Sequence, residues 1–393
     1  MKILFYRYGN ICEPDIIEQF TTLGLEIETE EAEITNKRLN GAERVKLLSN
    51  HLEKGGFLFV FSINFFPNVS DVCNIYGVPY VCWTVDSPIV ELYSKSIENP
   101  VNHIFVFDRA QYEELKQYIS AVYYLPLATN ADRWDRVNAN ITAGDRQRFS
   151  ADISFVGSLY TDNDPLKDIN MSEYLRGFLA GLYGMQREVE GVNLIEQALT
   201  NQVKEELKRL LPTYFEGFGE TVKPVDGYVA AHSLIGMHFS SLQRLKYLRA
   251  LGEHFDVKLF TRSSADGLKD LQRIKICGGV QTLTEMPKVF NLSKINLNMT
   301  IYPIEKGLPL RIWDVLGAGG FLLTNFREEL LEYFEPGVEL DYFSDENELV
   351  DKCEFYLKHD DVRRQIAASG YERVKDFHTY ANRMPGIFKN ILE

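Results

Sequence analysis

The sequence predicts an α/β protein with two doubly wound domains that face a central cleft, and three observations support this. Short apolar runs alternate with amphipathic helical stretches through the first 130 residues. A polar stretch without periodicity follows over residues 130–150, and a second alternating series begins after it. The chain has 393 residues, which is more than one ordinary hydrophobic core organises, so two domains are expected.

The first series predicts a parallel sheet covered on both faces, because strands that alternate with helices form right-handed βαβ units. Helical stretches such as 14–24 and 110–120 separate the apolar runs. We expect this domain to span residues 1–146. Its strand candidates are 2–8, 57–64, 79–86, 103–108 and 122–128.

The second domain is expected to span residues 147–378. A helical insertion at about residues 172–240 interrupts it, and its apolar spacing fits either an arm over the cleft or ordinary packing on one face of the sheet. The chain should end in a helix with a kink near His378 or Pro385. The strand candidates of this domain are 151–160, 256–260, 295–301, 321–325 and 339–343.

Composition and charge exclude several function classes. A formal net charge of −14 repels a nucleic-acid backbone, although a local basic pocket for a small anion remains compatible with it. The five cysteines are scattered without a C-x-x-C pair, which predicts reduced thiols and no zinc site. Neither a secretory leader nor an apolar run long enough to span a membrane is found, so we expect a cytoplasmic protein that is not integral to the membrane.

The stretch 307–325 predicts an anion site at the start of a helix. Pro309 suits the first helical turn, where a missing N–H costs nothing, and helix-start amides attract anions. Lys306 and Arg311 add two cations, and Asp314 follows one turn later on the same face. A phosphate followed by a ribose diol would need this order of groups. The alternative is a surface ion pair between Arg311 and Asp314.

A second phosphate contact is expected where the strand 151–157 ends. Gly157 and Ser158 follow that strand, and the missing Cβ lets backbone amides approach a phosphate. Arg244, in a helix after the insertion, is a further candidate, although such arginines are more often solvated. The triplet 162–164, Asp-Asn-Asp, fits a metal-binding motif or a plain turn, and the turn is favoured because Pro165 follows.

Asp86 is the candidate general base. It ends a strand of the first sheet, so its carboxylate should project into the cleft, where it could take a proton from a hydroxyl nucleophile. A carboxylate that caps the helix 87–97 is the alternative. Tyr8, Gly9 and Asn10 follow the first strand and should line the same edge of the sheet.

The order of motifs over residues 286–380, which includes "GLPLRIWDVLGAGGFLLTN", resembles the donor-binding domain of the bacterial CgeB-like glycosyltransferases of the spore-maturation type. The runs "GVPYVCWTVDSP", "YYLPLATN" and "DISFVGS" are similar to the same family, so the resemblance covers nearly the whole chain.

This resemblance implies a GT-B fold of two Rossmann-like domains, with the nucleotide-sugar held by the second, the acceptor by the first, and the last helix, about 379–393, joined to the first. It puts Gly157 and Ser158 at the pyrophosphate and Arg311 with Asp314 at phosphate and ribose, where Arg311 also serves catalysis. Many GT-B enzymes carry a glutamate at the position of Lys306, so this sequence departs from their pattern there. The implied donor-binding residues are Gly157, Ser158, Arg244, Val280, Gln281, Thr282, Asn298, Lys306, Leu308, Arg311 and Asp314.

The expected function is transfer of a sugar from a nucleotide-sugar, with UDP-sugar preferred, to a hydroxyl acceptor. The acceptor would be a protein Ser or Thr, as in flagellin or a spore coat, or a surface glycan. We expect no metal and no cofactor, because cations and helix-end amides can neutralise the departing diphosphate. The alternatives are a nucleotide-sugar epimerase or hydrolase of the same fold, and a catalytically silent binding module.

Overall fold

A computed structural model describes residues 1–189 and 191–392, and it divides into two compact units. Unit 1 comprises Met1–Leu127, Glu216–Val225 and Tyr380–Glu393, and unit 2 comprises Ala128–Phe215 and Asp226–Thr379. The boundary after Leu127 lies earlier than the expected 146 because residues 131–149 form two helices that pack on a helix of unit 2. None of the described helices is long and apolar enough to cross a bilayer.

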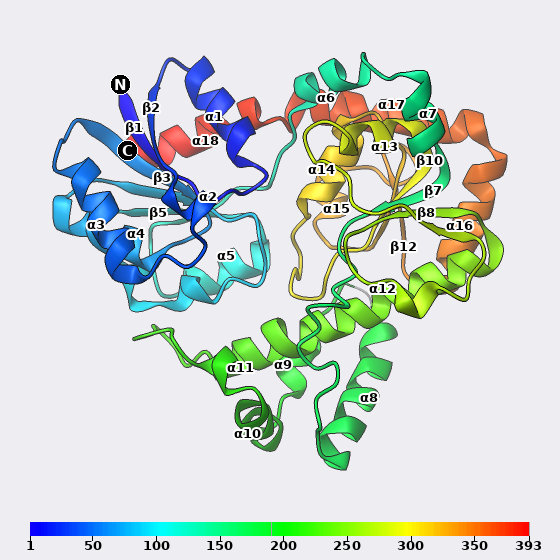
Figure 1. The fold of residues 1–393 in the computed structure, drawn as a ribbon, viewed down its shortest axis with the longest axis horizontal. Coiled ribbons are helices and arrows are strands. Elements are labelled where there is room, and N and C mark those ends of the chain that lie inside the picture. The colour runs from blue at the N-terminus through cyan, green and yellow to red at the C-terminus, as the bar shows by residue number, and fades with distance from the viewer. Residues whose placement is uncertain (190, 393) are drawn as a thin grey trace. The chain divides into compact units, whose positions relative to one another are not determined.

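Unit 1 contains one fully parallel sheet with the strand order β2-β1-β3-β4-β5-β6. The helices α1 and α18 pack together beside the sheet, and Phe388 of α18 meets the aromatic rings of Phe20 and Phe59. Figure 1 shows helices on both sides of the sheet. The strands are β1 Lys2–Tyr6, β2 Glu26–Glu30, β3 Phe57–Ile63, β4 Tyr80–Trp83, β5 Asn102–Val106 and β6 Val122–Tyr124. The helices are α1 Glu13–Thr22, α2 Ala32–Thr35, α3 Gly41–Leu52, α4 Pro67–Tyr76, α5 Arg109–Leu115 and α18 Tyr380–Leu392, with 3₁₀ turns η1 Val90–Tyr93 and η2 Lys95–Glu98.

Two elements of unit 1 differ from the sequence expectation. The edge strand β2 was not expected, because its sequence EIETE alternates charged residues with only one large apolar side chain. The expected helix 87–97 is instead two 3₁₀ turns, η1 and η2. Asp86 caps neither of them, because Ile89 and Ser94 hold their N-cap positions without any side-chain cap.

Unit 2 contains a second parallel sheet with the order β12-β11-β10-β7-β8-β9. The helices α6, α7, α13, α14 and α17 pack on one another, and α12 packs on α16 (Figure 1). The two sheets confirm the predicted doubly wound α/β fold. The strands are β7 Ala151–Val156, β8 Val257–Phe260, β9 Ile274–Ile276, β10 Ser293–Asn298, β11 Leu322–Asn325 and β12 Asp341–Phe343. The helices are α6 Ala131–Asn138, α7 Ala143–Phe149, α12 Met237–His254, α13 Met286–Leu292, α14 Leu310–Gly317, α15 Leu330–Tyr333, α16 Glu346–Lys358 and α17 Asp360–Phe377, with the 3₁₀ turn η5 Asp266–Leu268.

The insertion of unit 2 forms a small helical group with a core of its own, in which Leu175, Leu179 and Leu207 pack against Phe239 at the start of α12. The second half of α12 lies instead in the core of the sheet, through Leu248 and Leu251. A π-helix runs directly into α12. The members are α8 Glu173–Arg187, α9 Ile195–Ala198, α10 Asn201–Leu210, η3 Pro212–Phe215, α11 Asp226–Tyr228 and the π-helix η4 Val229–Gly236 (Figure 1).

Each sheet reverses its strand order once, between β1 and β3 in unit 1 and between β7 and β10 in unit 2. Open parallel sheets bind ligands beyond the carboxyl ends of the strands at such a reversal, because the following loops diverge there. The loops after β1 and β3 in unit 1, and after β7 and β10 in unit 2, are therefore the places to search for a site.

Candidate functional site

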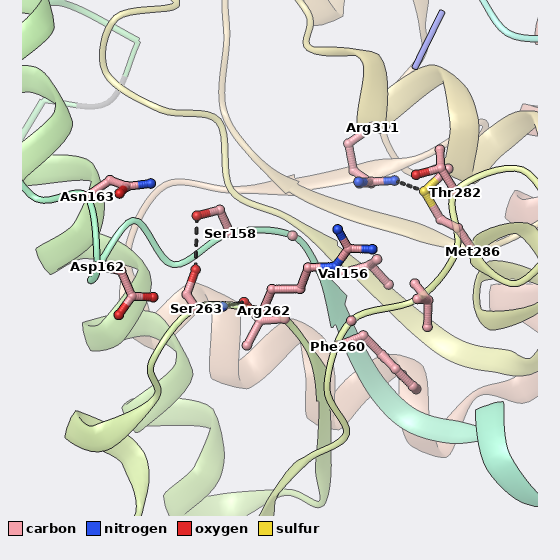
Figure 2. Close-up of a pocket in the computed structure, with 14 residues that line it drawn as sticks. Val156, Ser158, Asp162, Asn163, Phe260, Arg262, Ser263, Thr282, Met286 and Arg311 are labelled. Atoms are coloured by element: carbon pink, nitrogen blue, oxygen red, sulfur yellow. Dashed lines mark hydrogen bonds between the residues drawn. The ribbon is translucent and has the colours of Figure 1, made fainter. Parts of the chain in front are cut away.

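A cavity of about 340 Å³ lies in unit 2 beyond the carboxyl ends of β7 and β8. Its size is within the usual range for a small-molecule site. The start of α14 and the segment after β9 complete its walls, as Figure 2 shows. The lining residues are Val156, Gly157, Ser158, Asp162, Asn163, Phe260, Thr261, Arg262, Ser263, Gly279, Val280, Thr282, Met286 and Arg311.

The loop after β7 is held to the loop after β8. The backbone N–H of Gly157 donates to the carbonyl of Phe260, the last residue of β8, at 3.1 Å, which continues the sheet pairing one residue beyond β7. The hydroxyl groups of Ser158 and Ser263 are 3.1 Å apart, and Ser263 Oγ also accepts from the Leu159 N–H at 2.9 Å. These bonds fix two hydroxyl groups at the floor of the cavity, so they are ready to contact a polar ligand.

Arg311 enters the cavity from the first turn of α14. Its side chain is 22% exposed, lies over the Phe290 ring at 5.1 Å and contacts the sulfur of Met286. Arg262 reaches the same cavity from the loop after β8 (Figure 2). Gly279 leaves room for it, because a Cβ at that position would lie 2.6 Å from the Arg262 side chain.

Arg244 of α12 is buried behind the same loop. Its guanidinium donates to the backbone carbonyls of Ser158 and Met299 and lies 4.7 Å from the Tyr160 ring centroid. It therefore links the ends of β7 and β10, the two strands at the reversal point. The sequence did not distinguish this role from that of a solvated helix arginine, and the structure shows a residue that is only 9% exposed.

The cationic charge of this region exceeds its anionic charge, since Arg244, Arg262 and Arg311 outnumber the carboxylates of Asp162 and Asp314. Desolvation lowers the pKa of Arg311, Asp314 partly offsets that effect, and the positive charge of Arg244 lowers the pKa further. Desolvation also lowers the pKa of Arg244. Within the described part of the chain, the only carboxylate paired with Arg311 is Asp314 at 4.0 Å, and Arg244 and Arg262 form no ion pair there. Desolvated guanidinium groups favour an anionic ligand, because its negative charge compensates for the hydration that they lose on burial.

The structure brings five of the expected donor-binding residues to the cavity wall. They are Gly157, Ser158, Val280, Thr282 and Arg311. Gly157 and Arg311, from two segments far apart in the sequence, thus line one cavity.

Other expected donor-binding residues do not line the cavity. Asn298 is buried and its amide donates to the hydroxyl groups of Thr300 and Thr324. Lys306 pairs with Glu328 at 3.4 Å, and Leu308 is buried in the core. Gln281, Asp314 and Arg244 are likewise absent from its lining, although Asp314 and Arg244 act on it through Arg311 and Ser158.

Lining residues that the sequence analysis did not select follow β7 and β8. Arg262 and Ser263 come directly after β8, so the rule that pointed to Gly157 applied to them as well. Asp162 and Asn163 belong to the triplet interpreted as a turn. The structure splits that triplet, since Asp164 instead pairs with His238 of α12 at 2.8 Å.

A polar cluster in unit 1 gathers around Asp86 at the carboxyl ends of β1, β3 and β4. The Asn64 amide donates to Asp86 Oδ2 at 2.6 Å and to the Tyr8 hydroxyl at 2.8 Å, and Asn10 also donates to that hydroxyl at 2.8 Å. Desolvation raises the pKa of Asp86, and its bonds to Asn64 and Tyr8 oppose the rise. The sequence analysis did not select Asn64, although its place directly after β3 was a usable signal. Its backbone is left-handed, with φ 60°.

The backbone amides of the loop after β1 are already occupied. Those of Tyr8, Gly9 and Asn10 donate to Glu13 Oε1 at 2.9, 2.9 and 3.0 Å, and Glu13 is buried. Gly9 has φ 90°, which closes this ring of amides around the carboxylate. The side chains of Tyr8, Asn10 and Asp86 therefore carry any contact with a ligand there, and these amides do not.

Comparison with known proteins gives a sequence match over part of the chain. Residues 243–389 match the family model described as "Glycosyl transferase-like". A search among curated proteins gave no match.

Solved structures of similar fold cover the whole chain. A glycosyltransferase from Rickettsia africae ESF-5 has a TM-score of 0.57 at 11% identity over 100% of this chain and 98% of its own. Anabaena Alr3699/HepE in complex with UDP-glucose has a TM-score of 0.57 at 9% identity over 100% and 99%. Sucrose-phosphate synthase from Thermosynechococcus elongatus has a TM-score of 0.56 at 10% identity over 100% and 99%.

The fold is therefore that of GT-B glycosyltransferases. Residues 243–389 are thus similar in sequence to a glycosyltransferase family model, and the whole chain is similar in fold to a solved glycosyltransferase.

Proposed function

We propose that the protein transfers a sugar from a UDP-sugar to a hydroxyl acceptor, and that the cavity of unit 2 holds the donor. The observation that carries this proposal is the excess of guanidinium charge at the cavity, with Asp314 as the paired carboxylate at 4.0 Å. A diphosphate is the part of a nucleotide-sugar that such groups recognise. The UDP complex of Anabaena HepE, which has the same fold, supports the choice of nucleotide.

The donor would lie across the cavity with its diphosphate between Arg311 and the hydroxyl groups of Ser158 and Ser263. Arg311 is in the first turn of α14, where the helix dipole adds positive potential. These groups stabilise the negative charge that develops on the leaving diphosphate. We propose a metal-independent reaction on this basis, and activity that persists in EDTA is the expected result.

Asp86 is the proposed general base on the acceptor side if the reaction inverts the anomeric centre. Its carboxylate has hydrogen-bond partners that fix its position, and its raised pKa makes it a better proton acceptor than an ordinary aspartate. If the reaction retains the configuration, Asp86 is a polar group that orients the acceptor.

The CgeB-like subtype is part of the proposal. Its support is the run of motifs from 307 to 325 and the strand ends at Asp86 and Gly157. By that resemblance, the acceptor is a hydroxyl of a protein Ser or Thr or of a surface glycan.

Product analysis with UDP-sugars tests the proposal. A transferase releases UDP at a rate that rises with added acceptor and forms a glycosylated product. An epimerase or hydrolase converts the donor fully without acceptor, and a silent module converts none. Arg311→Ala should abolish turnover, whereas Arg249→Ala, which removes a surface arginine paired with Asp270, should leave it unchanged.

A further inference from the structure

A second, larger cavity of about 630 Å³ lies within unit 1, and nothing in the donor site accounts for it. Its walls are the start of α4, the turns η1 and η2, and the segment 216–220, which the insertion contributes to unit 1. The lining residues are Arg44, Pro67, Asn68, Val90, Glu91, Ser94, Lys95, Ser96, Glu216, Gly217, Phe218, Gly219 and Glu220.

The segment 216–225 is attached to unit 1 through residues 220–223. The Lys95 N–H donates to the Glu220 carbonyl at 2.7 Å, and the Val222 N–H donates to the Tyr93 carbonyl at 2.9 Å, in an antiparallel bridge. Lys223 pairs with Glu114 and lies 4.4 Å from the Tyr93 ring centroid. These contacts fix Glu220 at the wall of the cavity, and residues 216–219 extend that wall.

The charge in this cavity is anionic. Its two cations already have partners, since Arg44 binds Glu33 through two hydrogen bonds of 2.9 and 3.1 Å and Lys95 pairs with Glu98 at 2.6 Å. Three further carboxylates line the cavity without an ion pair within the described residues. They are Glu91, Glu216 and Glu220.

Ser94 is a second observation that points to a ligand. It lines the cavity, is only 6% exposed, and its Oγ has no hydrogen-bond partner among the described residues. A buried hydroxyl without a partner costs free energy, so its place at a cavity wall favours a group that bonds to it when bound.

We infer that this cavity binds a cationic group of the acceptor, a protonated amine or guanidinium, with Glu91, Glu216 and Glu220 around it and Ser94 as a hydrogen-bond partner. This inference rests on the proposed function, because only a transferase has an acceptor. It deepens that function by naming the chemistry of the acceptor. A lysine-bearing peptide and an amino sugar share this chemistry, and the test separates these two sources.

Calorimetry on the full chain tests the inference with three probes: a short peptide of serine and lysine, the same peptide with glutamate in place of lysine, and glucosamine. Binding of the lysine peptide or glucosamine, without binding of the glutamate peptide, is expected. The double variant Glu216→Gln/Glu220→Gln should weaken that binding roughly fivefold, since ion pairs of exposed carboxylates are worth about that much. Glu26→Gln, at an exposed position of β2, is the matched control and should change nothing.

Ser94→Ala adds a readout that a purely structural role would not give. It should weaken binding of the cationic probe by roughly threefold to tenfold, without lowering the stability of the free protein, because it removes a hydroxyl that has no hydrogen-bond partner in the described part of the chain. Equal binding of the two peptides, no binding of either cationic probe, or an equal loss in Glu26→Gln would overturn the inference. UDP binding is measured in the same variants and should stay unchanged if UDP binds in the cavity of unit 2. This measurement separates the failure of this inference from the failure of the proposed function.

Discussion

Arg311→Met should separate ligand binding from stability more clearly than other changes at the donor cavity. Methionine keeps the length and apolar contacts of the side chain over Phe290 and removes its charge. Charge-assisted hydrogen bonds to phosphate are worth about 1.5–3 kcal/mol, so we expect UDP to bind about 10- to 150-fold more weakly.

The free protein should not lose stability in this variant. Arg311 is mostly buried and desolvated, and Asp314, its paired carboxylate, is 4.0 Å away, so its charge gains little from the fold. Removal of the Arg311 charge also removes its desolvation cost, and that gain offsets the loss of a weak pair at 4.0 Å. The melting temperature without ligand should therefore equal or exceed that of the wild type.

Thermal unfolding with and without UDP measures both effects at once. At 100 times the wild-type dissociation constant, UDP should stabilise the wild type by about 2.7 kcal/mol, but a variant with 100-fold weaker binding by only about 0.4 kcal/mol. Arg249→Met is the control and should keep the full shift. A lower melting temperature of free Arg311→Met, with the UDP shift intact, would refute the reasoning.

Three further predictions concern stability and pH. Arg244→Met should lower the free energy of unfolding in urea by about 2–4 kcal/mol, because two buried carbonyls lose their donor; an unchanged midpoint would contradict this. Gly320→Ala should cost about 1–3 kcal/mol in the same assay, since the new Cβ would lie 2.7 Å from the Asn296 amide, and a neutral result would show that the turn relaxes. If Asp86 is the base, kcat should fall as the pH decreases through its raised pKa, because the carboxyl becomes protonated; Asp86→Asn should be nearly inactive at every pH, and a variant with the wild-type profile would exclude that role.

The fold was predictable where the sequence repeats a buried pattern. Strands such as β3 and β4, with the sequences FLFVFSI and YVCW, are runs of mainly apolar residues, and parallel strands covered on both faces have that composition. The edge strands β2 and β9 were missed, because EIETE and IKI are short and charged, and only their neighbours in the sheet make them strands. The break after α17 at His378, one of the two expected kink positions, followed from local sequence.

Part of the candidate site could also be predicted, because strand ends are readable from the chain. Gly157 directly follows a strand, and Arg311 lies in the first turn of a helix. Both positions could be predicted from local sequence without tertiary information. The contacts of Arg244 and the burial of Asn298 depend on packing between distant segments. The wall formed by residues 216–220 was equally hidden, because helices of unit 2 lie on both sides of it in the sequence.

The most direct test of the central claim is a calorimetric comparison of UDP, UMP and uridine on the full chain. If guanidinium groups at the cavity of unit 2 recognise a diphosphate, UDP should bind most tightly, UMP more weakly and uridine least, and added salt should weaken UDP the most. Equal affinity for UDP and uridine, or no binding of UDP, would contradict the account.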